Sequence, residues 1–420
     1  MNRFILVLGL MSGLAASSNA GDWPAWRGPT GQGVSDEQRL PLTWSETENV
    51  KWKIPLENPG NSTPIIWGNR IFLTQAKKGG SERSLFCYDR ATGKQLWKKD
   101  VEYAEKERNW TPDWYANLSP VTDGQRVVVS FGSAGMHCYD FEGKELWKRT
   151  DLGQWDHAFG HGSSPVLYKD LAILLCGPTL KQNRNFLLAV DKTTGKTVWE
   201  HDEKVGAWST PLIVNVNGQD QLLLAMSSDV KGAPDDKTGH FKGFDPNTGK
   251  ELWYTRGVNS HMYASPLYAK GIAVAMSGYQ GAALAVKLGG TDNITKDRLW
   301  IHPKNVQRVG SGVIVGDHVY IMDENGMPRC YELESGKETW NVQERPGSGV
   351  TWGSMAAADG KLYVMMRDGS TLVFNASPKY ELLATNRLGA GEQTNSSPAI
   401  SNGEIFLRTF RHLWCIAPKK

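Results

Sequence analysis

The stretch that decides the fold is AVDKTTGKTVW, residues 189–199. It predicts two strands joined by a tight turn, because the carboxylate of Asp191 can accept hydrogen bonds from the N–H groups of the turn. Gly195 supplies the positive φ that closes the turn, and the second strand runs outward to Trp199. A tryptophan buries a large area and keeps one N–H for a partner, which suits a wedge between neighbouring sheets.

The pattern recurs along the chain every 40 to 54 residues or so, a period typical of propeller blades. The copy at 140–147 is one residue shorter, the copy at 287–300 is stretched by an insertion, and the copy at 375–383 ends in Leu383 instead of Trp. We expect the outer strands to carry these docking tryptophans: Trp52, Trp97, Trp147, Trp199, Trp253, Trp300 and Trp340.

A second marker precedes each copy. Ser or Thr followed by Pro, as at 62–64 and 396–398, introduces alternating apolar residues, with degenerate versions at 312–313 and 354–355. Proline is tolerated at the first residue of a strand, where no ladder donor is needed. Each unit is therefore interpreted as four strands, A to D, and eight such units fit the chain.

The two ends of the chain complement each other. The last unit ends at 413–416 without a D strand, whereas residues 49–54 have D-strand character and no A–C set before them. Pairing them closes the ring and leaves no free sheet edge. The prediction is an all-β, eight-bladed β-propeller with four antiparallel strands per blade, over residues 48–420, after an extended segment at 21–47. A β-helix or solenoid is the rival, although its coils are usually shorter.

The first twenty residues resemble a secretory signal. Arg3 provides a basic start, residues 4–16 form an apolar run, and small residues precede a cleavage site near Ala20. A buried first helix is the alternative. No cysteine stands near that site, so we expect no lipid anchor, and no later segment approaches the roughly 20 apolar residues of a membrane span. We expect a periplasmic or secreted protein.

Charge and cysteine usage exclude some classes. The formal net charge is +3 with both signs interspersed, so we expect no nucleic-acid partner. The five cysteines are scattered, and most occupy one small, buried strand position, so we interpret them as structural thiols rather than disulfides. They are Cys87, Cys138, Cys176, Cys330 and Cys415.

The recurring Asp-x-x-Thr-Gly-x-x-x-Trp string resembles the tryptophan-docking motif of the pyrroloquinoline quinone (PQQ) repeat superfamily. One branch implied by this resemblance holds quinoprotein alcohol dehydrogenases, which bind PQQ and calcium on the propeller axis. Another holds non-enzymatic propellers, such as the lipoprotein that assists outer-membrane protein assembly. The opening WPAWRGP, residues 23–29, is similar to that of secreted PQQ-like propellers.

This chain departs from both branches. The dehydrogenases are longer and carry two adjacent cysteines against the quinone, whereas no Cys-Cys pair occurs here. The assembly lipoprotein carries a lipid-anchored cysteine, which is also missing. No calcium ligand or catalytic Asp of the enzymes can be matched to a position here, so no cofactor is predicted, with PQQ and calcium left as an alternative.

The D-to-A connections line one face of a propeller, and here they are rich in aromatic, His and Arg residues, with Asn395 completing the circle. Converging loops on a rigid scaffold are a common binding site. The candidate binding residues are Trp110, Trp114, Tyr115, Trp155, His157, His161, Trp208, His261, Arg308 and Trp352.

Simpler interpretations apply to several of them. His157 and His161 flank a loop, so their spacing does not imply helical metal-ligand geometry, and no metal is predicted. Trp110 and Trp114 either pack on blade edges or contact a ligand. The sequence favours a non-catalytic module that binds an envelope protein or a glycan. The alternatives are a PQQ-dependent alcohol dehydrogenase and a polysaccharide-acting enzyme.

Overall fold

The computed structural model describes most of the chain. The described residues are 21–107, 115–179, 184–227, 239–259, 261–278, 281–303, 309–323 and 325–418.

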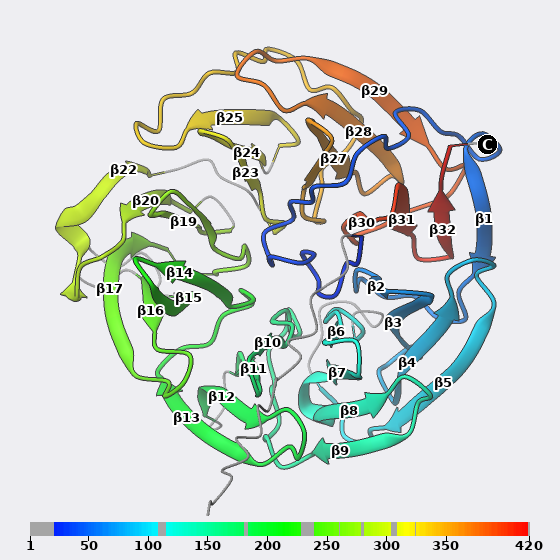
Figure 1. The fold of residues 1–420 in the computed structure, drawn as a ribbon, viewed down its shortest axis with the longest axis horizontal. Coiled ribbons are helices and arrows are strands. Elements are labelled where there is room, and N and C mark those ends of the chain that lie inside the picture. Colours follow the sequence, from blue (N-terminus) through cyan, green and yellow to red (C-terminus); the bar gives the residue numbers. More distant parts are fainter. Residues whose placement is uncertain are drawn as a thin grey trace, which may run out of the picture.

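Eight antiparallel sheets surround a central axis (Figure 1), which confirms the predicted eight-bladed propeller. We number the blades I to VIII from β2 onward and label the strands of each blade A to D, from the axis outward. The A strands are β2 (Ile65–Trp67), β6 (Val121–Thr122), β10 (Val166–Tyr168), β14 (Leu212–Val216), β18 (Leu267–Ala269), β23 (Val313–Val315), β26 (Ala356–Ala358) and β30 (Ala399–Ser401).

The B and C strands form the buried middle of each blade. The B strands are β3 (Arg70–Ala76), β7 (Arg126–Ser130), β11 (Leu171–Cys176), β15 (Gln219–Met226), β19 (Ile272–Met276), β24 (His318–Met322), β27 (Lys361–Met365) and β31 (Glu404–Arg408). The C strands are β4 (Glu82–Asp89), β8 (Met136–Asp140), β12 (Asn185–Asp191), β16 (Gly239–Phe244), β20 (Ala283–Lys287), β25 (Pro328–Glu332), β28 (Ser370–Asn375) and β32 (His412–Ile416).

The D strands form the rim and are more exposed. They are β5 (Gln95–Glu102), β9 (Glu145–Arg149), β13 (Thr197–Glu203), β17 (Glu251–Val258), β22 (Arg298–His302), β29 (Leu382–Arg387) and β1 (Val50–Pro55). In blade VI the fourth strand is reduced to a bridge between Tyr331 and Glu338. Two short 3₁₀ turns, η1 (Gly132–Ala134) and η3 (Thr295–Asp297), are the helical elements of the described residues.

The ring closes as predicted. Strand β1 pairs antiparallel with β32, placing Trp52 opposite Cys415 and Ile54 opposite Leu413. The first D-type strand therefore completes the last blade (Figure 1). Closure removes the unpaired edge that an open sheet would present.

A belt of hydrogen bonds joins all eight blades near the axis. In each blade a Ser or Thr donates its backbone N–H to the side-chain oxygen of the equivalent residue in the next blade, at 2.8–3.2 Å. The belt residues are Thr63, Ser119, Ser164, Thr210, Ser265, Ser311, Ser354 and Ser397. The small polar residue of the second sequence marker thus satisfies a buried N–H of its neighbour.

The rim tryptophans link each blade to the next. Trp97 Nε1 donates to the carbonyl of Phe141 at 2.8 Å, and Trp147 Nε1 donates to that of Lys192 at 2.9 Å. The turn glycine of the next blade lies against the indole, as Gly195 does on Trp147. Corresponding bonds are made by Trp52, Trp199, Trp300 and Trp340.

Trp253 differs from the expected docking arrangement. Its Nε1 donates to Gln221 Oε1 within its own blade at 2.8 Å, and its ring is fully buried. A Cβ on Gly243, its cross-strand partner, would overlap the indole. The cause lies in the insertion of the next blade, where Asp292 pairs in parallel with Trp253 and replaces the usual turn. The indole therefore turns inward, into space that only glycine leaves open.

The cysteines are all free and buried, in agreement with structural thiols. Burial raises the pKa of the Cys87 and Cys138 thiols to about 12. These side chains pack as small apolar residues inside the sheets.

The segment 21–47 begins inside the ring and then crosses to β1 at the rim (dark blue in Figure 1). Trp23 forms a bridge with Ile66 of β2, and Val34 forms one with Ala357 of β26. Arg27, almost fully buried, donates from Nη2 to the carbonyl oxygens of Gln32 and Gly312. The first part of the segment therefore packs against the inner strands of the ring.

Candidate functional site

A cavity of about 370 Å³ lies on the axis and is lined almost entirely by D-to-A connections. We call it the axial pocket. One repeat position, two residues before the belt hydroxyl, contributes a residue from every blade: Asn61, Asn117, Gly162, Trp208, Tyr263, Val309, Trp352 and Asn395. The remaining lining residues are Phe159, His161, Ser164, Ser397 and Trp26, the last from the N-terminal segment. Most of the pocket wall is therefore built from one equivalent residue of each blade.

Three neighbouring blades supply a ladder of amides. Asn395 Nδ2 donates to Asn61 Oδ1 at 3.2 Å, and Asn61 Nδ2 donates to Asn117 Oδ1 at 2.6 Å. Arg367 Nε donates to Asn395 Oδ1 at 3.1 Å, and Asn117 Nδ2 donates to the carbonyl of His161 at 3.2 Å. A guanidinium only donates and a carbonyl only accepts, so the two ends fix the orientation of every amide between them.

The opposite side of the pocket is aromatic and centred on Trp208. Its ring contacts His157 edge-on at 4.7 Å between centroids, Tyr263 at 4.9 Å, and His261 nearly parallel at 6.1 Å. Trp208 Nε1 donates to the carbonyl of Gly160 at 2.9 Å. Space for this ring comes from Gly162, where a Cβ would lie 2.8 Å from Trp208 Cβ.

Trp352 forms the wall in blade VII. The guanidinium carbon of Arg367 lies 3.9 Å from the centroid of its ring. This cation–π contact, together with the bond to Asn395, places the charge of Arg367 behind the lining.

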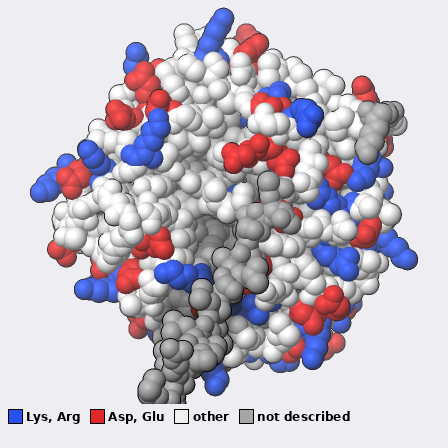
Figure 2. Space-filling view, viewed as in Figure 1, with Lys and Arg blue, Asp and Glu red and all other residues white. Residues whose placement is uncertain are grey.

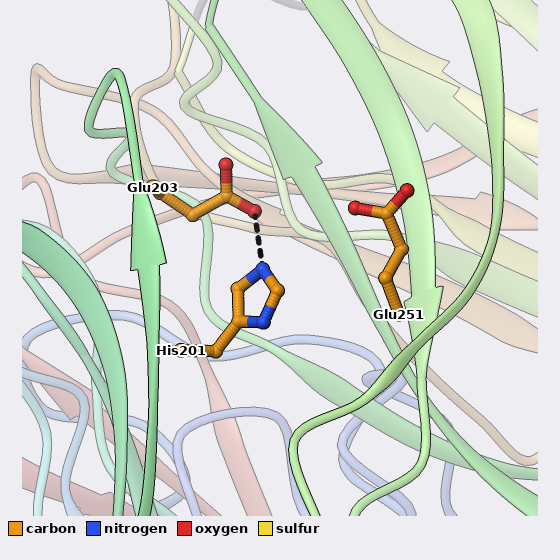
Figure 3. Close-up of side chains that lie close together, drawn as sticks. All are labelled: His201, Glu203 and Glu251. Carbon is orange, nitrogen blue, oxygen red and sulfur yellow. Dashed lines mark ion pairs between the residues drawn. The ribbon is translucent and has the colours of Figure 1, made fainter.

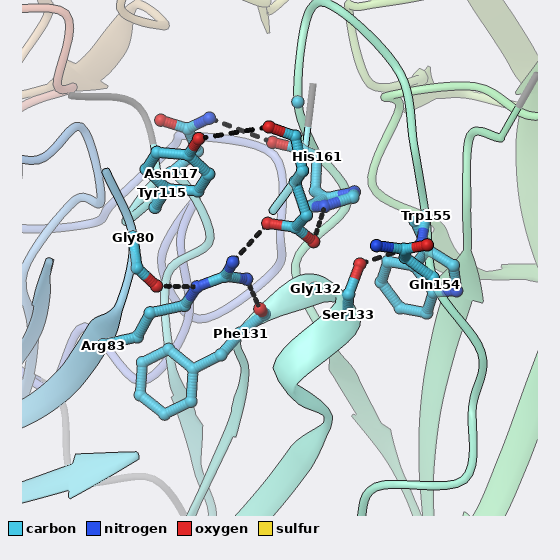
Figure 4. A network of polar contacts seen from close by, with 12 residues as sticks. Gly80, Arg83, Tyr115, Asn117, Phe131, Gly132, Ser133, Gln154, Trp155 and His161 are labelled. Carbon is cyan, nitrogen blue, oxygen red and sulfur yellow. Dashed lines mark hydrogen bonds and ion pairs between the residues drawn. The ribbon is translucent and has the colours of Figure 1, made fainter. Parts of the chain in front are cut away.

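A buried charged network supports the pocket from behind (Figure 4). Glu107 forms an ion pair with Arg83 and lies 3.2 Å from His161 Nε2. Arg83 also donates to the carbonyls of Gly80 and Phe131, and its guanidinium lies 5.1 Å from the Tyr115 ring. The network ties blades I, II and III together beneath His161.

The charge state of Glu107 follows from these partners. Burial alone would raise the pKa of its carboxyl, but the hydrogen bond from His161 and the charges of His161 and Arg83 outweigh burial and hold the pKa at about 2. Glu107 is therefore ionised at neutral pH and can only accept, so His161 Nε2 carries the hydrogen that they share.

The structure places the described candidate residues in three groups. His161, Trp208 and Trp352 line the axial pocket, and His157 and His261 contact the Trp208 ring. Two others lie behind the lining: Tyr115 in the Arg83 network, and Trp155, which is 1% exposed and packs edge-on against His161. Trp110, Trp114 and Arg308 lie outside the described residues.

His157 and His161 make separate contacts rather than facing one another as a pair. His157 Nδ1 accepts the N–H of Phe159 at 3.1 Å, whereas His161 Nε2 faces Glu107.

The prediction omitted several lining residues, above all Asn61, along with Trp26, Phe159 and Val309. For Asn61 and Val309 a signal was present in the sequence, because both stand at the repeat position two residues before the belt residue. Asn61, Asn117 and Asn395 each stand three residues before the proline of the second marker. Aligning that position across all units would have listed the whole ring.

A second cluster, at the rim, contains His201, Glu203 and Glu251 (Figure 3). Lys242 Nζ lies 2.8 and 3.0 Å from the Glu203 carboxylate oxygens and 3.1 Å from Glu251 Oε2. Burial would lower the pKa of Lys242, but the two carboxylates raise it overall. The ammonium pairs with both carboxylates and offsets part of their charge, so we interpret the cluster as an ion-pair network.

The surface electrostatics agree with the sequence. Lys and Arg are interspersed with Asp and Glu over the visible face, and broad areas carry neither (Figure 2). Among the described residues, no helix is both long enough and apolar enough to span a bilayer.

The described lining fits PQQ with calcium poorly. It contains no Asp or Glu to ligate the cation and no Lys or Arg to pair with the carboxylates of the quinone. Arg367, which contacts the lining, is engaged with Asn395 and Trp352. No chemical step is therefore assigned to this group here.

Comparison with known proteins places the chain among PQQ-repeat propellers. A stretch of 67 residues, 16% of the chain, is 39% identical to a quinoprotein ethanol dehydrogenase of Pseudomonas putida, and it spans 9% of that enzyme. The structure of BamB from Moraxella catarrhalis aligns with a TM-score of 0.61 at 13% identity, covering 88% of this chain and 97% of that one. The quinohemoprotein alcohol dehydrogenase of Comamonas testosteroni aligns with a TM-score of 0.69 at 11% identity, covering 97% and 82%.

Identities this low in the two structural alignments support the fold alone. The family described as outer membrane protein assembly factor BamB matches residues 81–342, more than half of the chain. These residues carry the C and D strands of blade I, blades II to VI and most of the pocket wall. The chain belongs to this family of PQQ-like repeat propellers.

Proposed function

We propose that this protein is a non-catalytic binding module that captures its partner at the D-to-A face, with the axial pocket as the anchor point. It acts in the periplasm or outside the cell, after cleavage near Ala20. The partner is an envelope macromolecule, either a protein or a glycan.

The observation that carries this proposal is the chemistry of the pocket wall. Its described residues supply amides, aromatic rings including the phenol of Tyr263, one imidazole and two serine hydroxyls, together with one glycine and one valine. The hydroxyls of Ser164 and Ser397 belong to the belt, where they accept backbone N–H groups at 3.0 and 2.8 Å. The imidazole of His161 is held by Glu107. This set can bind and orient a ligand, but it supplies no nucleophile with an adjacent base.

A protein partner is supported by the description of the family, whose name refers to outer-membrane protein assembly. A glycan partner is supported by the amide and aromatic composition of the pocket.

An alternative is a PQQ-dependent alcohol dehydrogenase. The local identity to the Pseudomonas putida enzyme favours it. The absence of carboxylates from the described lining and the separate, buried positions of all five cysteines oppose it. A polysaccharide-acting enzyme has less support, because glycoside hydrolysis generally needs two carboxylates flanking the bond.

The deciding experiment uses the purified protein supplied with PQQ and calcium. We expect no stoichiometric quinone spectrum and no dye-linked oxidation of primary alcohols. Immobilised protein is then exposed to an envelope extract, with the Trp352→Leu variant as the comparison. Oxidation of alcohols by the quinone-bound protein would contradict this proposal and support the dehydrogenase. Capture that depends on Trp352 supports the binding module.

A further inference from the structure

We infer that the axial pocket binds one neutral sugar ring at the end or branch of a glycan, an assignment that rests on the proposed binding function. Three features of the described lining carry it: the arc of amides, the arc of aromatic rings, and the lack of charged side chains between them.

The amide arc suits hydroxyl groups. Asn61 and Asn395 each donate one hydrogen bond and accept one within the ladder. A primary amide carries two N–H donors and two lone pairs, so each keeps a donor and an acceptor for a ligand. A sugar hydroxyl also donates and accepts at once, and adjacent hydroxyls repeat this pairing around the ring. Both asparagines are half-buried, so a ligand in the pocket can reach them.

The ladder also limits how far the amides can turn. Its ends are a donor-only guanidinium and an acceptor-only carbonyl, so rotating one amide breaks bonds on both sides. The remaining donors and acceptors are therefore held in a fixed order before a ligand arrives. Such preorganisation favours binding, because the side chains lose little freedom when the ligand enters.

The aromatic arc suits the other side of the same ring. Trp208, Tyr263 and Trp352 come from the repeat position that supplies the asparagines, on the opposite half of the circle. Sugar rings carry C–H bonds on their faces, and these pack against the electron-rich face of an indole or phenol. Hydroxyl groups at the edge of the ring then point toward the asparagines.

Charge and size narrow the class of ligand. The described lining contains neither acidic nor basic side chains apart from His161, so a uronic acid or a phosphate finds no matched partner. The volume of about 370 Å³ lies near the lower end of the range for small-molecule sites. A compact neutral ring fits these limits better than an extended chain.

The test is a calorimetric and tryptophan-fluorescence titration of the purified protein. The probes are four neutral tetrasaccharides (cellotetraose, maltotetraose, mannotetraose and N-acetylated chitotetraose), with tetragalacturonate and a neutral tetrapeptide as comparisons. We expect saturable binding of at least one neutral tetrasaccharide and none of tetragalacturonate. If no neutral tetrasaccharide saturates the protein up to about 10 mM, the assignment is overturned.

Two variants locate the binding. Asn61→Asp keeps the shape of the side chain but removes its donors, and Trp352→Leu removes an aromatic wall. Each is expected to weaken binding about tenfold or more, which corresponds to roughly 1.4 kcal/mol. The matched controls are Asn247→Asp in an exposed turn and Trp67→Leu at the last residue of β2, neither of which lines the pocket. Circular dichroism checks folding, and unchanged affinity in both pocket variants would place the sugar elsewhere and overturn the assignment.

This test separates the sugar assignment from the function on which it rests. PQQ-dependent oxidation of alcohols would contradict both the sugar assignment and the binding function. A protein partner that is captured through Trp352 while every saccharide fails to bind, or binding of the tetrapeptide alone, would leave the binding module in place and exclude the sugar.

Discussion

His161 Nε2 lies 3.2 Å from Glu107 Oε1, and this buried contact connects a wall of the axial pocket to the Arg83 ion pair behind it. The Glu107 side chain is 2% exposed and that of Arg83 is 1% exposed. The two charges are therefore mutually dependent, because neither has access to water.

The first prediction concerns this dependence. Glu107→Ala leaves the Arg83 guanidinium buried without its acid, and we expect a loss of about 3–5 kcal/mol in the free energy of unfolding. The nearby Glu105 is exposed, so Glu105→Ala serves as the control and should change stability by less than about 0.5 kcal/mol. Urea denaturation at pH 7 measures both. Equal effects of the two substitutions would contradict the buried network.

A second prediction follows from the pKa of Glu107, which falls from its ordinary value of 4.5 to about 2 in the folded protein. Because the folded-state pKa is depressed, the stabilisation is present above pH 4.5 and is lost as the pH falls toward 2. The Glu107→Gln variant lacks this titration, so its stability should depend less on pH in that window. Denaturation midpoints at several pH values between these limits measure it, and parallel curves for the two proteins would refute it.

The third prediction tests the belt. Thr210 Oγ1 accepts the N–H of Ser164 at 3.0 Å, so Thr210→Val keeps the shape but leaves that buried N–H unpaired, at a cost of about 1–3 kcal/mol. The hydroxyl of the adjacent Ser209 is buried without a partner among the described residues. Ser209→Ala is therefore the matched control, and it should be neutral or slightly stabilising. Thermal and urea denaturation distinguish the two, and a reversed order would count against the belt.

The fourth prediction tests why position 243 is glycine. Gly243→Ala forces a Cβ into the Trp253 ring and should destabilise the protein by about 1–3 kcal/mol. In the Trp253→Leu background the same change should cost much less, so a double-mutant cycle should yield a coupling of about 0.5–3 kcal/mol. Gly349→Ala is the control for the glycine substitution, because a Cβ at that position would meet no other atom within 4 Å. Additive effects would mean that the indole does not occupy this space.

The fifth prediction concerns the thiols. Burial raises the pKa of Cys330 to about 11 and those of the other four cysteines further. Thiolates are the reactive species, so a disulfide reagent at pH 8 should label none of the five in the native protein and all five in urea. A thiol that reacts rapidly in the native state would show that its blade opens locally.

The residues of the pocket illustrate how far sequence analysis reached. The D-to-A face was predicted because connections from rim to axis must converge there, and His161, Trp208 and Trp352 do line the pocket. Trp155 also stands in a D-to-A connection that is rich in aromatic and His residues, yet it is buried behind His161. A connection of many residues can turn any of its side chains inward, and its composition does not show which ones turn.

Local chemistry in the sequence was enough to determine the blades and their closure. The turn at Asp191 and Gly195 and the outward strand to Trp199 depend on residues close together in the chain. Eight copies of such a unit bury their faces against one another, and a closed ring does so without leaving a free edge. Contacts between distant residues were decided by the tertiary structure alone. Asn395 and Asn61 are separated by 334 positions and meet only because the ring closes. Trp253 turns inward because a neighbouring blade has lost its turn. Periodicity specifies which side chains repeat, whereas packing decides which of them touch.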